Sequence, residues 1–121
     1  MITNWRIEEV PAIMTLLEPI ASRCGFLISA YGSTVRRGEG RDLDLICVQK
    51  RIGVSPAMLL DGLAHELHGK IEQESSSLFA ELCGMIRLPD GRLVDVQIRL
   101  SRCGPQDAES MYTQTPWGVR L

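Results

Sequence analysis

Two aspartates, Asp42 and Asp44, stand one residue apart at the start of the apolar run LDLICVQ, which is typical of a β-strand. Residues two apart in a strand project from the same face, so the two carboxylates should lie close together. Like charges this close raise a carboxyl pKa unless a cation neutralises them. Oxygen ligands with an incomplete shell suit Mg²⁺ or Mn²⁺, which keep water and bind substrate phosphate oxygens. The pair therefore predicts a divalent metal site.

A third carboxylate, Asp95, lies in the middle of the alternating segment LVDVQIRL. The alternation places Asp95 on the polar face, opposite Val94 and Val96. If the strands that carry Asp42 and Asp95 are neighbours, all three carboxylates converge on the open face of the sheet, and helices cover the other face. The alternative for each aspartate is an ordinary solvated strand residue, and for an isolated D-x-D pattern that alternative is the usual one.

A phosphate-binding segment is expected ahead of the first two aspartates. Gly32 permits close approach of the backbone to an anion, and Ser33 adds a hydroxyl, the more so if a helical turn begins there. Arg36 is a candidate phosphate contact, with Arg37 and Arg41 ranking below it. Surface loops also carry arginine for solubility, so that alternative stays open. A phosphate cradle followed by a metal site suits phosphoryl or nucleotidyl transfer.

The segment from Phe26 to Leu100 resembles the DNA polymerase beta-type nucleotidyltransferase superfamily in the order of these motifs. In its small size the chain resembles the minimal branch of that superfamily. The resemblance implies an α/β (α+β) fold, a nucleotidyltransferase-like mixed β-sheet with helices on one face. Two positions depart from the family pattern. Arg41 stands where serine or threonine is usual, and Arg37 stands where glycine is usual.

The same resemblance implies roles for the motif residues. Three are expected to be catalytic and to bind Mg²⁺ or Mn²⁺, and three to hold a nucleoside triphosphate, with ATP as the first choice. They are Asp42, Asp44 and Asp95 in the first group and Gly32, Ser33 and Arg36 in the second.

The resemblance implies transfer of a nucleoside monophosphate to an acceptor hydroxyl on a protein side chain, an RNA end or a small molecule. No separate substrate domain is expected, so a partner chain or a second copy should present the acceptor, as in toxin–antitoxin pairs. The alternatives are a non-catalytic nucleotide- or partner-binding regulatory module on the same fold and, as a third reading, a metal-dependent phosphohydrolase.

Composition limits the domain number, the binding partners and the cellular location that the chain could have. A length of 121 residues predicts one domain, 1–121, and 45% hydrophobic residues supply a core. A net charge of −2 argues against a general nucleic-acid coat. Four scattered cysteines favour free thiols in a reducing cytoplasm over zinc or disulfides. No secretory leader and no apolar run of roughly 18 residues is seen, which predicts a cytoplasmic protein without a membrane span.

Periodicity predicts the supporting elements. Helices are expected over 11–24 and from Ser55-Pro56, the second with an apolar stripe reaching Ile71. A strand is expected over 26–30, and a loop or single helical turn over 32–41. A hairpin is expected from 82 to 100, turning at Asp90-Gly91 with positive φ at both residues. The segment 101–121 receives no structure and is a candidate docking or interface tail.

Overall fold

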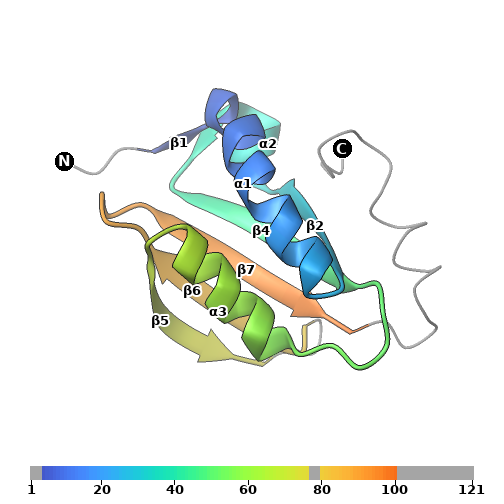
Figure 1. Ribbon diagram of the computed structural model, residues 1–121. Coiled ribbons are helices and arrows are strands. Elements are labelled where there is room, and N and C mark those ends of the chain that lie inside the picture. Colours follow the sequence, from blue (N-terminus) through green and yellow to red (C-terminus); the bar gives the residue numbers. More distant parts are fainter. Residues whose placement is uncertain (1–3, 77–79, 101–121) are drawn as a thin grey trace.

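The computed structural model describes residues 4–76 and 80–100 (Figure 1). Five of its strands form one mixed sheet in the order β2-β4-β7-β6-β5. Within that sheet β4 and β7 pair in parallel and all other neighbours pair antiparallel. The predicted tail, 101–121, lies outside the described residues. The strands are β2 (Phe26–Tyr31), β4 (Asp42–Gln49), β5 (Lys70–Ser75), β6 (Leu82–Arg87) and β7 (Leu93–Arg99).

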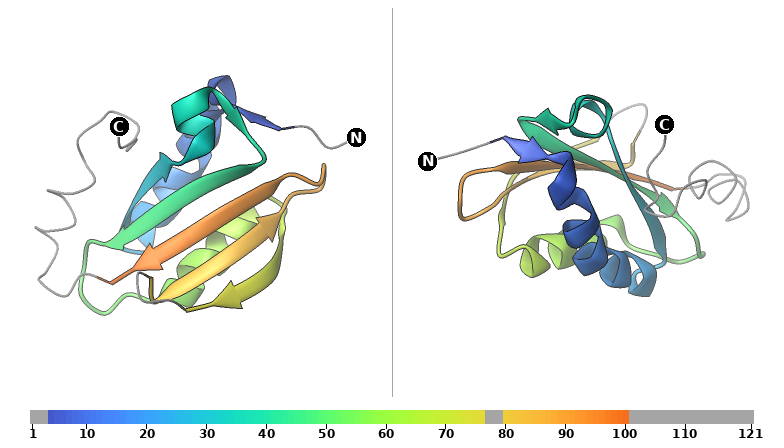
Figure 2. Two further views of the ribbon diagram at one scale, coloured as in Figure 1. Left: turned by 180° about the vertical axis from the view of Figure 1, so that it is seen from behind. Right: turned by 90° about the horizontal axis from the view of Figure 1, so that it is seen from above.

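Helices α1 (Val10–Arg23) and α3 (Pro56–Glu66) both pack on one side of the sheet, and the view from behind shows the strands in front of them (Figure 2). The core lies between the two layers, where alternate residues of β4 and β7, such as Leu43 and Val94, are fully buried. The predicted fold class, a mixed sheet with helices on one face, is therefore confirmed. Within residues 4–76 and 80–100, no helix has the length and apolar character needed to cross a membrane.

The second helix begins as its sequence predicts but ends earlier. The Ser55 hydroxyl accepts a hydrogen bond from the Met58 amide at 3.2 Å, and Pro56 occupies the first turn. The helix stops at Glu66, and His68 follows with φ +54°. The prediction that Ile71 continues the apolar stripe of this helix was wrong, because Ile71 lies in β5.

Strand β5 was not predicted at all. It is the edge of the sheet, and five of its six residues are exposed, so its sequence KIEQES carries no hydrophobic alternation. A register shift between Ile71 and Gln73 breaks the period further. Charged residues and a bulge are typical of edge strands that must avoid pairing with other chains.

The hairpin of β6 and β7 is present, but its turn differs from the prediction. Gly91 donates to the Leu88 carbonyl at 2.9 Å, so Pro89 and Asp90 are the central residues. Gly91 follows with φ +93°, while Asp90 keeps a negative φ. The expectation of positive φ at both Asp90 and Gly91 was wrong, because the ring of Pro89 fixes its own φ near −65° and this excludes the mirror-image turn.

The N-terminal segment fastens two strands together at one end of the sheet. Strand β1 (Trp5–Arg6) pairs with β3 (Glu39–Gly40), directly before β4, and leads through a short 3-10 turn, η1 (Ile7–Glu9), into α1. The buried indole of Trp5 donates to the carbonyl of Leu93 in β7 at 2.8 Å. Arg92 stacks over the indole at 3.9 Å from the ring centroid and pairs with Glu9. Trp5 therefore holds the start of β7 beside the segment that enters β4.

This clamp gives the first prediction. Trp5→Ala should lower the free energy of unfolding by roughly 3–5 kcal/mol, since a large buried side chain is deleted. Trp5→Phe keeps most of the packing but loses the hydrogen bond to Leu93, and should cost about 1–2 kcal/mol. Urea unfolding followed by circular dichroism measures both. A loss below about 1 kcal/mol for Trp5→Ala would show that the indole does not carry the clamp.

Candidate functional site

The parallel pairing of β4 with β7 brings the predicted aspartates together. Asp44 is the direct neighbour of Asp95 across the ladder, and Asp42 stands opposite Leu93, two residues before Asp95. All three aspartates are partly exposed and alternate with buried core residues such as Leu43. Their side chains therefore lie on the sheet face that α1 and α3 leave open.

Burial and mutual repulsion make this face electrostatically unusual. Burial raises the pKa of Asp44 to about 6, and the negative charges of Asp95 and Asp42 push it in the same direction. The pKa of Asp95 is also raised, first by burial and then by Asp42. The positive charge of Arg36 acts against the rise at Asp44. A cluster that holds its acids above their usual pKa is a common property of functional sites.

Gly32 meets the carboxylate of Asp44 with its backbone. It has φ +84° and ψ −159°, a conformation that residues with a side chain hardly adopt. A Cβ at this position would collide with Oδ2 of Asp44. The glycine is therefore required twice, for its backbone angles and for the space that Asp44 occupies.

A short helix, α2 (Ser33–Arg37), begins immediately after this glycine. The buried Thr34 hydroxyl donates to the Asp42 carbonyl at 2.9 Å, which ties α2 to the first residue of β4. Gly40 packs tightly against this junction, since a Cβ there would lie 2.9 Å from the Ser33 hydroxyl oxygen. These contacts fix Gly32 and Ser33 beside the aspartates. The spacing of these residues in the sequence did not by itself predict this proximity.

Two arginines of this segment, Arg36 and Arg37, differ in where they lie. Arg36 is close enough to Asp44 to influence its pKa. Arg37 lines a separate hollow of about 240 Å³ together with Arg6, Glu8 and Glu39, on the side of β1 and β3. Arg36 as a phosphate contact stays a prediction.

Sequence reasoning missed Tyr31. It ends β2 opposite Asp44, so Tyr31, Asp44 and Asp95 form one row across three strands. Burial raises the pKa of Tyr31 to about 12, and the charges of Asp44 and Asp95 add to the effect. The phenol therefore stays protonated beside the carboxylates. The position of Tyr31 immediately before Gly32 was the only sign in the sequence that it lies near the site. Its place opposite Asp44 follows from the β2–β4 register.

The donor set fits a hard divalent cation in its chemistry, since it consists of carboxylate oxygens on one face beside a glycine backbone. The side chains as they stand do not yet enclose an ion. Among the described residues, no three His, Cys, Asp or Glu side chains form an arrangement that could hold a metal. Asp44 and Asp95 are direct neighbours, so a shared cation requires the side-chain torsions of the aspartates to turn, with the strands in place.

Comparison with known proteins gives one kind of match. No family model matches the chain, and no curated protein matches it in sequence. Among solved structures, polymerase beta of Leishmania infantum, in a ternary P/T complex, matches with a TM-score of 0.53 and 18% sequence identity. The match covers 83% of this chain and 44% of the polymerase chain. The chain has a nucleotidyltransferase-like fold of the polymerase beta type and spans less than half the length of that polymerase chain.

The contact between Gly32 and Asp44 gives a prediction with a matched control. Gly32→Ala should lower the free energy of unfolding by about 1–3 kcal/mol from the backbone, and further because Asp44 must move. Gly38→Ala also places alanine at positive φ, +91°, but nothing lies within 4 Å of the added methyl. Urea unfolding should therefore show the larger loss for Gly32→Ala. Equal losses would mean that the contact with Asp44 has no effect on stability.

The raised pKa of Asp44 predicts how stability depends on pH in metal-free buffer. The unfolded chain ionises this carboxyl near pH 4 and the folded chain near pH 6, so the folded state binds more protons between these values. The free energy of unfolding should fall as pH rises from about 4 through about 6, and stay lower above. Asp44→Asn removes this loss, and should be more stable than the wild type at pH 7.5 but not at pH 3.5.

The expected gain at pH 7.5 is on the order of 1 kcal/mol, because a half-exposed carboxylate is partly screened by solvent. Thermal unfolding in EDTA at both pH values measures it. Asp61→Asn, which changes an exposed aspartate of α3, is the matched control. Identical pH profiles for Asp44→Asn and the wild type would contradict the assignment of the charge cluster.

Proposed function

We propose that the chain is a metal-dependent nucleotidyltransferase that moves a nucleoside monophosphate from a nucleoside triphosphate to an acceptor hydroxyl. The observation that carries the proposal is the β4–β7 register, in which Asp44 and Asp95 are direct neighbours on the open face and Asp42 lies on the same face. The nucleotidyltransferase-like fold, which the chain shares with a polymerase beta at 18% sequence identity, supports it.

In this proposal the chain's own residues divide the work. Asp42, Asp44 and Asp95 would hold Mg²⁺ or Mn²⁺, which when bound neutralises the triphosphate and increases the acidity of the acceptor hydroxyl. Gly32 and Ser33 bind the β- and γ-phosphates through backbone and hydroxyl. Arg36 is the third residue expected to hold the nucleotide. Its positive charge acts on Asp44, and it would offset the negative charge of the phosphates.

The transfer itself is a displacement at the α-phosphorus. The acceptor oxygen forms the new bond to the α-phosphorus, the bond from the α-phosphorus to its bridging oxygen breaks, and pyrophosphate leaves. ATP is the first-choice donor. Asp95 accepts the acceptor proton as the general base. Tyr31 stays protonated in the same row and is available as a hydrogen-bond donor.

In this proposal the chain is a minimal member of the nucleotidyltransferase superfamily. The carboxylates lie on an open sheet face, and water competes at an open site. We therefore expect a second chain, either another copy or a different protein such as the toxin of a toxin–antitoxin pair, to cover the site and present the acceptor. Transfer by the chain with and without that partner, at equal concentration, tests this part.

The direct test combines binding with transfer. Calorimetric titration of Mg-ATP should show saturable binding, and ATP labelled on its α-phosphate should label an acceptor and release pyrophosphate in equal amount. The double variant Asp42→Asn with Asp44→Asn should abolish both while it remains folded. Release of phosphate or pyrophosphate without a labelled acceptor would instead identify a phosphohydrolase.

Asp95→Asn gives a separate prediction. The substitution should keep Mg-ATP affinity within a few-fold, since the triphosphate is still held on the β4 and α2 side by Asp42, Asp44 and Ser33. The transfer rate should fall by about 10²–10⁴-fold, the usual contribution of a general base. Affinity by calorimetry and single-turnover rates give the two quantities. An equal loss of affinity and rate would show that Asp95 builds the nucleotide site and does not act on the acceptor.

One observation favours a second candidate, a non-catalytic nucleotide- or partner-binding module on the same fold. The acidic side chains of the described residues do not form a three-ligand cluster as they stand. A binding module needs no such cluster. Saturable Mg-ATP binding without transfer to any acceptor, in the presence of a bound partner chain, would favour this candidate.

A further inference from the structure

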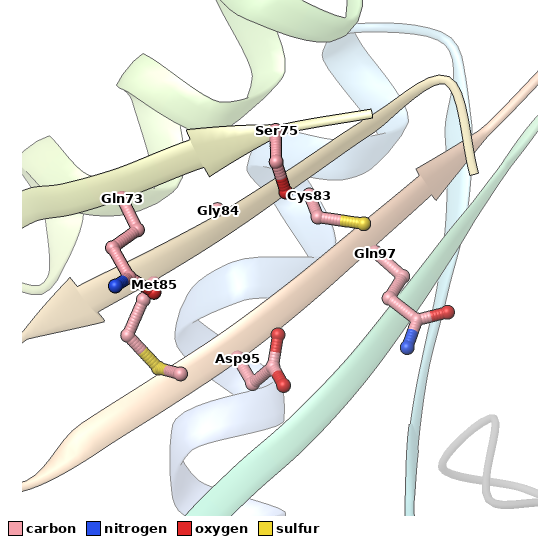
Figure 3. A pocket seen from close by; sticks show the side chains of 7 residues that line it. All are labelled: Gln73, Ser75, Cys83, Gly84, Met85, Asp95 and Gln97. Carbon is pink, nitrogen blue, oxygen red and sulfur yellow. The ribbon is translucent and has the colours of Figure 1, made fainter. Parts of the chain in front are cut away.

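A hollow of about 240 Å³ lies on the open face of β5, β6 and β7 (Figure 3). Two cross-strand rows build it. Gln73, Met85 and Asp95 form the first row, and Ser75, Cys83 and Gln97 form the second. The labelled side chains come from three strands and point to the same side of the sheet, with Asp95 at one edge of the group (Figure 3).

Asp95 stands between this hollow and the proposed nucleotide side. Strand β7 lies between β4 and β6, so Asp44 is the neighbour of Asp95 on one side and Met85 is its neighbour on the other. Gly32, Ser33 and Arg36 all belong to the β4 side. A group that enters the hollow therefore meets the Asp95 carboxylate from the side opposite the triphosphate, as an attacking group must in an in-line displacement.

The chemistry of the hollow is polar but nearly uncharged. Two carboxamides, a hydroxyl, a thiol and a thioether line it, and Asp95 is the one charged side chain among the described residues that form it. Arg87 follows Met85 on the same face of β6, but its guanidinium is engaged by Glu72 at 2.6 Å and by the Gly91 carbonyl at 3.0 Å. None of the described residues that line the hollow is a cation, and its two carboxamides both donate to and accept from a hydroxyl.

We propose that this hollow is the acceptor subsite, and that it selects an uncharged hydroxyl group of side-chain or single-sugar size in preference to a phosphate-bearing nucleic-acid end. The inference rests on the proposed transferase function and adds the substrate class. The volume supports it, because sites for drug-sized ligands usually measure about 300–1,000 Å³. Gln73 and Gln97 are the specificity-determining residues, and they orient the hydroxyl beside Asp95.

Cys83 gives the hollow a native reporter that does not depend on catalysis. Its thiol is partly exposed and lines the hollow, while Cys24 is partly exposed at the end of α1 and Cys47 is buried. Iodoacetamide labelling, read by mass spectrometry of peptides, compares Cys83 with Cys24 in the same sample. A compound that occupies the hollow should slow alkylation of Cys83 several-fold and leave Cys24 unchanged.

The probes are N-acetyl-tyrosinamide, methyl glucoside and an adenylyl-adenosine dinucleotide, each at millimolar concentration. Shielding of Cys83 by the tyrosinamide points to a protein side chain as the acceptor, and shielding by the glucoside points to a free sugar. Either outcome supports the proposal, provided that the dinucleotide shields less. Stronger shielding by the dinucleotide, or no shielding by any probe, would overturn it.

Gln73→Glu provides the mutational test. Gln73 lies on exposed β5, two strands from Asp95, so the added carboxylate disturbs the hollow and leaves the fold and the metal side intact. Transfer to the hydroxyl probe should fall roughly tenfold, the loss that one hydrogen bond to a neutral group explains, with unchanged Mg-ATP affinity. The control is Glu74→Gln on the opposite side of β5, where its partner Gly84 faces Leu60 of α3.

The result separates the two proposals. Unchanged transfer in Gln73→Glu overturns the acceptor subsite and leaves the transferase proposal intact. Shielding of Cys83 by a hydroxyl probe, with no Mg-ATP binding, keeps the hollow as a binding site for hydroxyl compounds and overturns the transferase.

Discussion

The parallel ladder between β4 and β7 is the constraint on which the rest of the molecule depends. It joins two segments that are distant in sequence and sets Asp44 directly beside Asp95. A slip of one residue would turn Asp95 toward the helices and expose Val94 and Val96, which are fully buried. The hydrophobic core therefore selects the register, and the register in turn determines which acids meet on the open face.

The two faces of the same strands have opposite requirements. On the helix side, complete burial of alternate residues supplies the stabilising free energy of the sheet. On the open side, burial and like charge raise the pKa of Asp44 and Asp95, which destabilises the ionised state. Such opposition is common where a fold carries a reactive site, because the core offsets the cost of the site. The contacts of Trp5 and Thr34 secure the strand ends nearest to the acids.

The sequence predicted the elements that carry a strong periodic signal. Both long helices, the strands on either side of Gly32-Ser33 and the last hairpin were predicted from apolar spacing. The fold class was predicted from the resemblance that the motifs carry. Strand β5 was missed because its residues are exposed at the edge of the sheet. It is held to β6 by backbone pairing, which leaves no hydrophobic pattern in the sequence. The turn was misjudged because the influence of Pro89 on its own φ outweighs the Asp-Gly signal.

The site was predictable to the extent that it lies within one strand or one turn. Asp42, Asp44 and Gly32-Ser33 are local patterns, whereas Tyr31 and the hollow beside Asp95 arise from rows that run across strands. Cross-strand neighbours depend on register, which is set when distant strands pack together and cannot be seen in any single segment of the sequence. The functions of these residues remain predictions, while their positions now follow from the described fold.

The position of β7 also has a consequence for the growing polypeptide. It is the last of the described strands to leave the ribosome, yet it fills the centre of the sheet between β4 and β6. Until it arrives, the nascent chain has two separate antiparallel pairs, β2-β4 and β5-β6, each with an unpaired edge that invites association with other chains. The pairing of β7 with β4 joins segments that are distant in sequence, so it is slow relative to the pairing of β7 with β6 across their hairpin turn. Chaperone protection should therefore matter most in the interval before β7 is inserted, and the acidic site is completed only when β7 pairs with β4.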